Sequence, residues 1–93
     1  MSERLFNPSD QLTFDTVQKD SQRLIILLQD SQTTSLRLDL HDVVQCDSAG
    51  LALLIETKRL CNRYRKALII EGLPKAIAGL AEFCGVETML EHV

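Results

Sequence analysis

The sequence contains no tryptophan, only three cysteines, and no hydrophobic run longer than five residues. A helix that crosses a bilayer needs about 20 consecutive apolar residues, so we expect no membrane span. The cysteines, Cys46, Cys61 and Cys84, are odd in number and form no Cys-x-x-Cys pair, which argues against a disulfide framework and against a zinc site. We therefore expect reduced thiols that are mostly buried.

Glycine is scarce as well, and the four glycines form neither of the glycine-rich motifs that bind nucleotide phosphates. The nucleophile elbow of hydrolases, Gly-x-Ser-x-Gly, is incomplete, because Cys46 stands where the first glycine would precede Ser48. The two histidines, His41 and His92, show no spacing that would assemble a catalytic triad with that serine. The sequence therefore predicts a protein without catalytic activity and without a cofactor.

Positive charge is not in excess, since ten Lys and Arg stand against thirteen Asp and Glu and give a net charge of −3. This balance disfavours a nucleic-acid-binding protein, which needs cations to neutralise phosphates. Asp39, Asp42 and Asp47 lie close in sequence, but such carboxylates are more often solvated or capping groups than metal ligands, so we expect no metal. The N-terminal segment has mixed charge and no apolar stretch, which does not fit a secretory signal and favours a cytoplasmic protein.

Three segments are predicted to contain the strands. The turn-forming sequence Asn7-Pro8-Ser9-Asp10 predicts a hairpin with short strands over residues 4–6 and 11–14. Residues 35–40 alternate leucine with polar side chains, which is typical of a strand. Residues 67–71 form a short apolar run before a glycine and are predicted to be a buried strand.

Three segments are predicted to be helices. Asp15 is expected to cap a helix that runs to about residue 30, although its apolar run 24–28 would also fit a strand. A second helix is predicted over residues 49–63, where apolar residues recur at helical spacing. Pro74 is expected to open a third helix at its first turn, and Gly85 to end it in a left-handed conformation.

These elements predict an α/β fold in a single domain that spans residues 1–93. The strands over 35–40 and 67–71 are expected to pair in parallel through a helical crossover. Together with the N-terminal hairpin they would form a mixed sheet of about four strands, with the helices packed mainly on one face and the other face open to solvent or a partner. A last apolar turn is expected from Val86, Met89 and Leu90.

A cluster of cations lies at the expected end of the second helix. Attraction to the negative end of the helix dipole, together with solubility, is enough to explain it. Contact with an acidic partner surface is the alternative. The cluster consists of Lys58, Arg59, Arg63, Arg65 and Lys66.

The segment from Cys46 to Gly50 places a serine hydroxyl at the positive end of the second helix. Ser48 is predicted to be the N-cap of that helix. An exposed hydroxyl at this position can also accept a phosphate or lie in a docking surface. Because Leu53, Leu60 and Tyr64 lie beside the core-facing stripe of the helix, we expect part of this apolar surface to remain available to a partner.

The residues from Leu38 to Leu54, which include Asp47-Ser48-Ala49-Gly50-Leu51, resemble the core of STAS domains. The similarity extends to the segment Leu12–Val17 and to Gly72-Leu73-Pro74, and it covers about residues 11–91. Within the family, the chain is most similar to the small STAS subunit, of the MlaB type, of the ABC transporter that maintains lipid asymmetry in Gram-negative envelopes. Antagonists of anti-sigma factors share the loop, and in them the serine is phosphorylated.

The resemblance implies a STAS fold and a cytoplasmic subunit without enzymatic activity, associated with a transporter complex at the inner membrane. Its partner would be the ATPase of an ABC transporter for phospholipid, bound through the loop and the helix that follows it. The implied alternative is an anti-sigma factor antagonist whose Ser48 is phosphorylated by an anti-sigma kinase. The expected partner-binding residues are Asp47, Ser48, Ala49, Gly50, Leu51 and Leu53.

Overall fold

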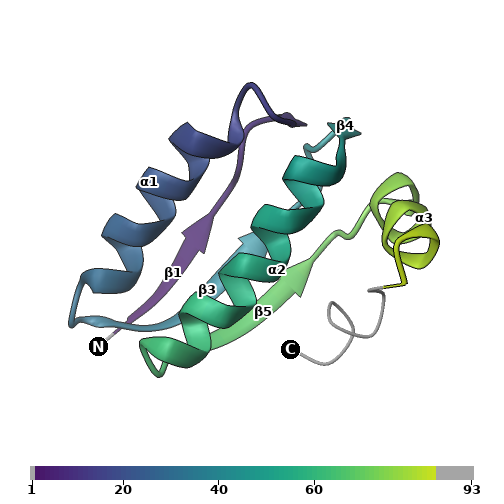
Figure 1. Cartoon of the computed structure of the whole chain (residues 1–93). Coiled ribbons are helices and arrows are strands. Elements are labelled where there is room, and N and C mark those ends of the chain that lie inside the picture. The colour runs from purple at the N-terminus through teal and green to yellow at the C-terminus, as the bar shows by residue number, and fades with distance from the viewer. Residues whose placement is uncertain (1, 86–93) are drawn as a thin grey trace.

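The structure is a computed structural model that describes residues 2–85. Along the described residues, α1 and α2 each follow two strands and α3 follows one (Figure 1). The described elements are β1 (Ser2–Phe6), β2 (Gln11–Leu12), α1 (Val17–Gln29), β3 (Thr33–Asp39), β4 (Gln45–Cys46), α2 (Ser48–Arg63), β5 (Ala67–Glu71) and α3 (Lys75–Phe83). The predicted last turn over Val86, Met89 and Leu90 lies outside the described residues.

The strands of residues 2–85 form two separate parallel sheets. β1, β3 and β5 form a three-stranded sheet in that order, and β2 pairs with β4. The predicted parallel pairing of β3 with β5 is confirmed, with Leu36 opposite Leu68. The predicted hairpin and the four-stranded mixed sheet are wrong, because β1 lies parallel to β3 and β2 lies parallel to β4.

The segment between β1 and β2 explains why the turn sequence does not form a hairpin. Ser9 donates its backbone N–H and its hydroxyl to the carboxylate of Asp20, at 3.1 and 3.0 Å. Asp20 belongs to α1 and is fully buried. A buried carboxylate must be hydrogen-bonded, so this contact holds the segment against α1 and directs the chain away from β1.

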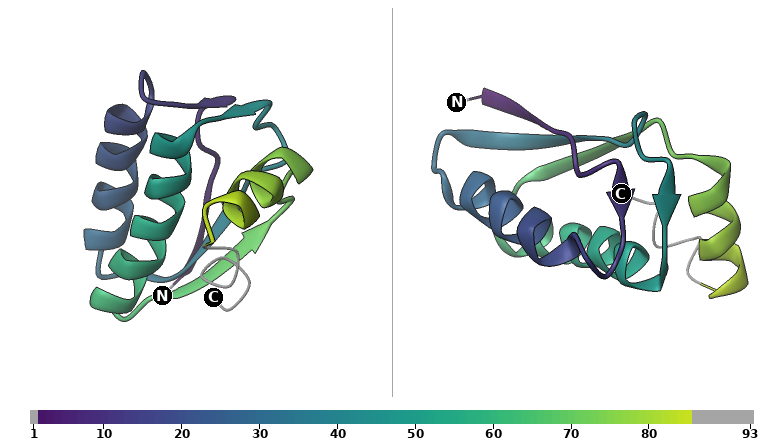
Figure 2. Two further views of the ribbon diagram at one scale, coloured as in Figure 1. Left: turned by 45° about the vertical axis from the view of Figure 1, so that its right-hand side comes forward. Right: turned by 90° about the horizontal axis from the view of Figure 1, so that it is seen from above.

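The two long helices pack on the same face of the three-stranded sheet, while α3 lies beyond the end of β5 (Figures 1 and 2). The core lies between the helices and this sheet, and Ile77 and Ala81 of α3 extend it. The apolar run 24–28 is helical, because Leu24 and Leu28 fall on the buried stripe of α1. Other buried core residues are Phe6, Leu12, Leu36, Leu38, Leu40, Val43, Leu51, Leu53, Leu54 and Cys61.

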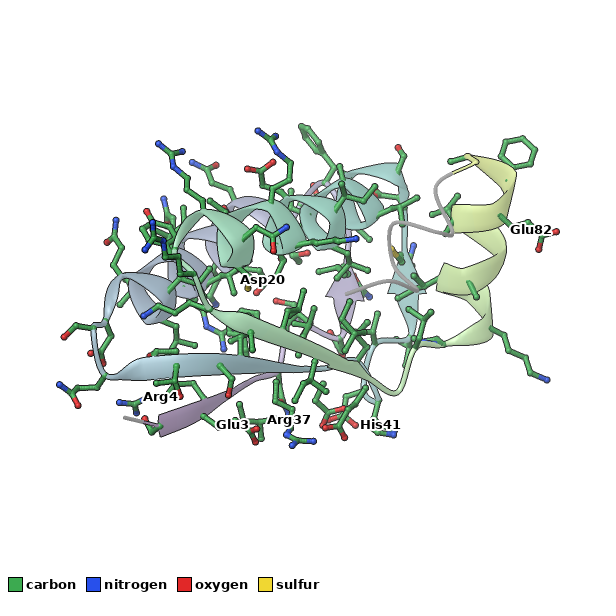
Figure 3. The ribbon with its side chains drawn as sticks, turned by 90° about the horizontal axis from the view of Figure 1, so that it is seen from below. Glu3, Arg4, Asp20, Arg37, His41 and Glu82 are labelled. Atoms are coloured by element: carbon green, nitrogen blue, oxygen red, sulfur yellow. The ribbon has the colours of Figure 1, made fainter. Side chains whose placement is uncertain are left out.

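The opposite face of the three-stranded sheet is uncovered by the described residues, as the sequence led us to expect. Arg37 in the central strand pairs there with Glu3 at 2.8 Å and with Glu71, and Figure 3 shows Glu3 and Arg37 on the side away from the helices. Leu5 of β1 is 60% exposed on this face. Since Ile69 is exposed too, β5 is half-buried and not a fully buried strand as predicted.

The ends of the helices differ from the sequence prediction by one or two residues. Thr16, not Asp15, is the N-cap of α1. Pro74 is the N-cap of α3 and so precedes its first turn, and Gly85 has the predicted left-handed backbone, with φ 73°. Because α3 already ends at Phe83, Cys84 falls outside its buried stripe and is exposed, contrary to the expectation of mostly buried thiols.

Candidate functional site

The pairing of β2 with β4 brings the two loops of the candidate site together. Gln11 lies opposite Gln45 and Leu12 opposite Cys46. Just beyond this pair, the backbone N–H of Asp47 donates to the carbonyl of Leu12 at 3.3 Å. The turn after β2 and the loop after β4 therefore lie side by side, at the starts of α1 and α2 (Figure 1).

Asp47 joins these two loops through its carboxylate. Oδ1 accepts a hydrogen bond from the N–H of Gly50, and Oδ2 accepts one from the N–H of Phe14, both at 3.0 Å. The bond from Phe14, followed by that from Gly50, lowers the pKa of the Asp47 carboxyl below its usual value. Asp47 is therefore an anion at neutral pH that holds the start of α2 against the turn after β2.

The N-cap of α2 is Asp47 and not Ser48, which corrects the sequence prediction. The backbone of Asp47 is extended, as an N-cap requires, and its carboxylate reaches the amide of the third helical residue. Ser48 is the first residue of the helix and is exposed. Because Asp47 supplies the cap, the Ser48 hydroxyl is not needed for capping and stands at the positive end of α2.

Gly50 allows α2 to begin very close to β2. A Cβ atom at this position would lie 1.9 Å from the carbonyl oxygen of Leu12 and 2.9 Å from Sγ of Cys46. No side chain fits in that space. Gly50 is therefore a spacing residue that sets how closely the loop and the turn approach each other.

The structure divides the six predicted partner-binding residues by exposure. Gly50 and Leu51 are buried, and Leu53 is 9% exposed, so its side chain belongs mainly to the core. Ser48 is exposed, while Asp47 and Ala49 are half-buried at the surface. The side chains that can meet a partner are thus mostly those of the loop itself, and the buried ones hold the loop in place.

A shallow groove of about 360 Å³ runs between the first halves of α1 and α2, beside the loop. Its lining is mainly small or apolar, with one carboxylate at its edge. The residues that line it are Val17, Gln18, Ser21, Ala49, Ala52, Leu53 and Glu56. The groove extends the candidate site from the loop onto both helices.

The sequence did not single out Phe14 as a site residue, because the expected hairpin placed it at the end of a strand. In the structure its backbone is bound to Asp47, 33 residues away, and its side chain is 79% exposed. Nothing in the local sequence distinguishes it from an ordinary strand residue. Only the pairing of β2 with β4 places it next to the loop that contains Ser48.

The thiols of Cys46, beside the loop, and of Cys61, near the other end of α2, are poor nucleophiles. Burial raises the pKa of the Cys46 thiol to about 11, and burial likewise raises that of Cys61 to about 11. Both are therefore protonated at neutral pH.

Within residues 2–85, no group of three or more His, Cys, Asp or Glu side chains is arranged to hold a metal ion. No helix in the same residues has the length and apolar composition to span a membrane.

The basic cluster at the end of α2 lies apart from the loop, at the other end of the helix. Arg59 pairs with Glu56 at 2.9 Å, and Nζ of Lys66 donates to the carbonyl oxygens of Asp30 at 3.3 Å and Thr33 at 2.5 Å. At least two of its cations thus have partners within the fold.

Comparison with known proteins gives one result. A family model described as "Mlab, STAS domain" matches residues 9–91. Comparisons with curated proteins and with solved structures gave no significant match. The matched range contains β2, β3, β4 and β5 and the three helices described within residues 2–85, and with them the entire candidate site.

Proposed function

Because the chain belongs to the STAS domain family, we propose that it is a non-catalytic subunit that binds and regulates the ATPase of an ABC transporter. The transporter would move phospholipid between the membranes of a Gram-negative envelope and so maintain outer-membrane lipid asymmetry. The chain would lie on the cytoplasmic side of the inner membrane, held there by its partner. The surface that binds the ATPase would be the loop from Asp47 to Leu51 together with the adjoining groove.

The observation that carries this proposal is the double hydrogen bonding of Asp47. Its carboxylate fixes the loop and the turn after β2 in one arrangement before any partner arrives. A surface that is already ordered loses little conformational entropy on association. Around it lie Ser48, Ala49 and Ala52, whose small side chains let a partner approach closely. This combination suits protein docking.

The experiment is a binding titration of the purified chain against the ABC ATPase subunit from the same organism. Ser48→Asp should weaken binding at least about tenfold, because a second carboxylate beside the ionised Asp47 would be desolvated in the interface. Ser48→Ala should bind almost as well as the wild type. Both variants should keep the melting temperature, since Asp47 and not Ser48 caps α2.

Ser31→Asp is the matched control. Ser31 is exposed in the turn after α1, at the opposite end of that helix from the candidate site. The same substitution there should leave affinity for the ATPase unchanged. Equal affinity for the wild type and Ser48→Asp would place the interface elsewhere and contradict the proposal.

A second function, that of an anti-sigma factor antagonist, is favoured by one observation. The Ser48 hydroxyl is exposed at the positive end of a helix, where a phosphate would be stabilised. Intact-mass spectrometry of the chain from native cells distinguishes the two functions. We expect an unmodified mass, and stoichiometric phosphorylation at Ser48 would favour the antagonist.

A further inference from the structure

We propose that Phe14 is the anchor of the docking surface and inserts into an apolar pocket of the ATPase that has a rim of Lys and Arg side chains. This inference rests on the function proposed above and names the chemistry of the partner at the same site. Three properties of the Phe14 region support it, namely exposure, rigidity and charge.

The large apolar side chain of Phe14 is exposed to solvent. It is 79% exposed, next to the loop that contains Ser48. Aromatic side chains are enriched among the few residues that contribute most to protein interfaces, where they fill pockets in the partner. An exposed phenylalanine beside a docking loop is therefore well placed to be buried on association.

The backbone of Phe14 is held by hydrogen bonds on both sides. The N–H of Thr13 donates to the hydroxyl of Thr16 at 3.0 Å, and that hydroxyl donates to the carbonyl of Gln11 at 2.5 Å. The N–H of Phe14 itself donates to Asp47 at 3.0 Å. The turn thus presents the aromatic ring from a fixed backbone, which lowers the entropic cost of binding.

The surroundings of Phe14 are acidic. Residues 10–16 and 42–55, which contain β2, β4, the two loops and the first half of α2, include four carboxylates and no Lys or Arg. Asp15 follows Phe14 in the turn, Asp10 precedes β2, and the ionised carboxylate of Asp47 accepts a hydrogen bond from the N–H of Phe14. Because complementary interfaces pair negative with positive charge, these carboxylates predict a rim of Lys and Arg around the partner's pocket. The same charges repel an anionic lipid surface, which argues against insertion of Phe14 into a membrane.

The chain contains its own control for this proposal. Phe83 at the end of α3 is 90% exposed, more than Phe14, but it lies outside the two loops. Phe14→Ser and Phe83→Ser remove the same aromatic ring from two exposed sites, one beside the docking loop and one away from it. Both should leave the melting temperature within a few degrees of the wild type, because neither ring is part of the core.

The test is a titration of the wild type and both variants against the purified ABC ATPase subunit. Phe14→Ser should weaken binding about 30-fold, the loss typical of an anchor residue, and Phe83→Ser less than about twofold. Asp15→Asn should slow association and reduce its dependence on salt, since charges at the rim of an interface act mainly on encounter. Phe14→Leu should retain most of the affinity, because it preserves an apolar anchor.

Each contrary result overturns the inference in a distinguishable way. If Phe14→Ser binds like the wild type while Ser48→Asp does not bind, the docking function stands and the anchor is wrong. If the wild type itself does not bind the ATPase, both proposals fail. Binding of the wild type to vesicles of anionic phospholipid, lost in Phe14→Ser, would assign Phe14 to a membrane instead. Dimers in sedimentation that depend on Phe14 would assign it to a second copy of the chain.

Discussion

Replacing Gly50 by alanine tests the geometry on which the candidate site depends. Two effects oppose each other at this position. Alanine is a better helix former than glycine by about 1 kcal/mol, which by itself would stabilise α2. The added Cβ would, however, lie 1.9 Å from the carbonyl oxygen of Leu12, about 1 Å inside the closest approach that Cβ atoms make.

The steric effect should win by a clear margin. The atom in the way belongs to the backbone of β2, which is paired with β4 and cannot rotate aside like a side chain. Overpacking of a well-packed site costs about 1 to 3 kcal/mol, and occasionally more. Here a strand must move against a helix, so we expect the upper end of that range. The net loss of stability should be about 2 kcal/mol.

The assay is thermal unfolding of the purified variants followed by circular dichroism. A net loss of about 2 kcal/mol in a domain of this size lowers Tm by about 8 to 16 °C. Gly79→Ala in α3 is the matched control, because a Cβ there meets no atom within 4 Å. With no clash, only the gain in helix propensity of about 1 kcal/mol remains, and Tm should rise by about 4 to 8 °C.

The opposite signs of the two substitutions make the comparison decisive. If Gly50→Ala unfolds at the wild-type temperature or above it, α2 does not begin against Leu12. The pairing of β2 with β4 would then be misplaced, and Phe14 would not lie beside Ser48. A fall in Tm for Gly79→Ala would show that the effect is not specific to the close contact.

Three further substitutions test other parts of the structure. Arg65→Gly should stabilise the fold by about 0.5 to 1 kcal/mol in urea unfolding, because Arg65, just after the C-cap of α2, has a left-handed backbone with φ 58°. Asp20→Ala should cost about 1 to 3 kcal/mol in the same assay, since it leaves the part-buried donors of Ser9 without an acceptor. The Asp47 carboxylate has a lowered pKa, so its contribution is complete above its usual value of 3.8 and is lost as the pH falls through the folded-state pKa. Asp47→Asn should therefore lower Tm at pH 7, and this difference in Tm should shrink as the pH is taken below 3.8 and disappear below the lowered pKa of the folded state. A difference in Tm that persists unchanged at low pH would contradict the bridging role of Asp47.

The sequence by itself determined the elements whose signals are local. Leucines alternating with polar residues predicted β3, and helical spacing predicted α2 within one residue of its start. Gly85 was predicted to end α3 in a left-handed conformation because glycine adopts it without steric cost. The similarity of the loop around Ser48 to STAS domains also needed only the sequence, and the family match supports it.

The tertiary structure decided which strands pair, which residue caps α2 and which side chains surround Ser48. The turn sequence before β2 fits a hairpin locally, but the buried carboxylate of Asp20 binds Ser9 and redirects the chain. Asp47 and Ser48 are equally good caps by residue type. Asp47 is the cap because its second carboxylate oxygen also accepts a hydrogen bond from the backbone N–H of Phe14, 33 residues away. Contacts of this kind join residues distant in sequence, so no pattern within a local window contains them.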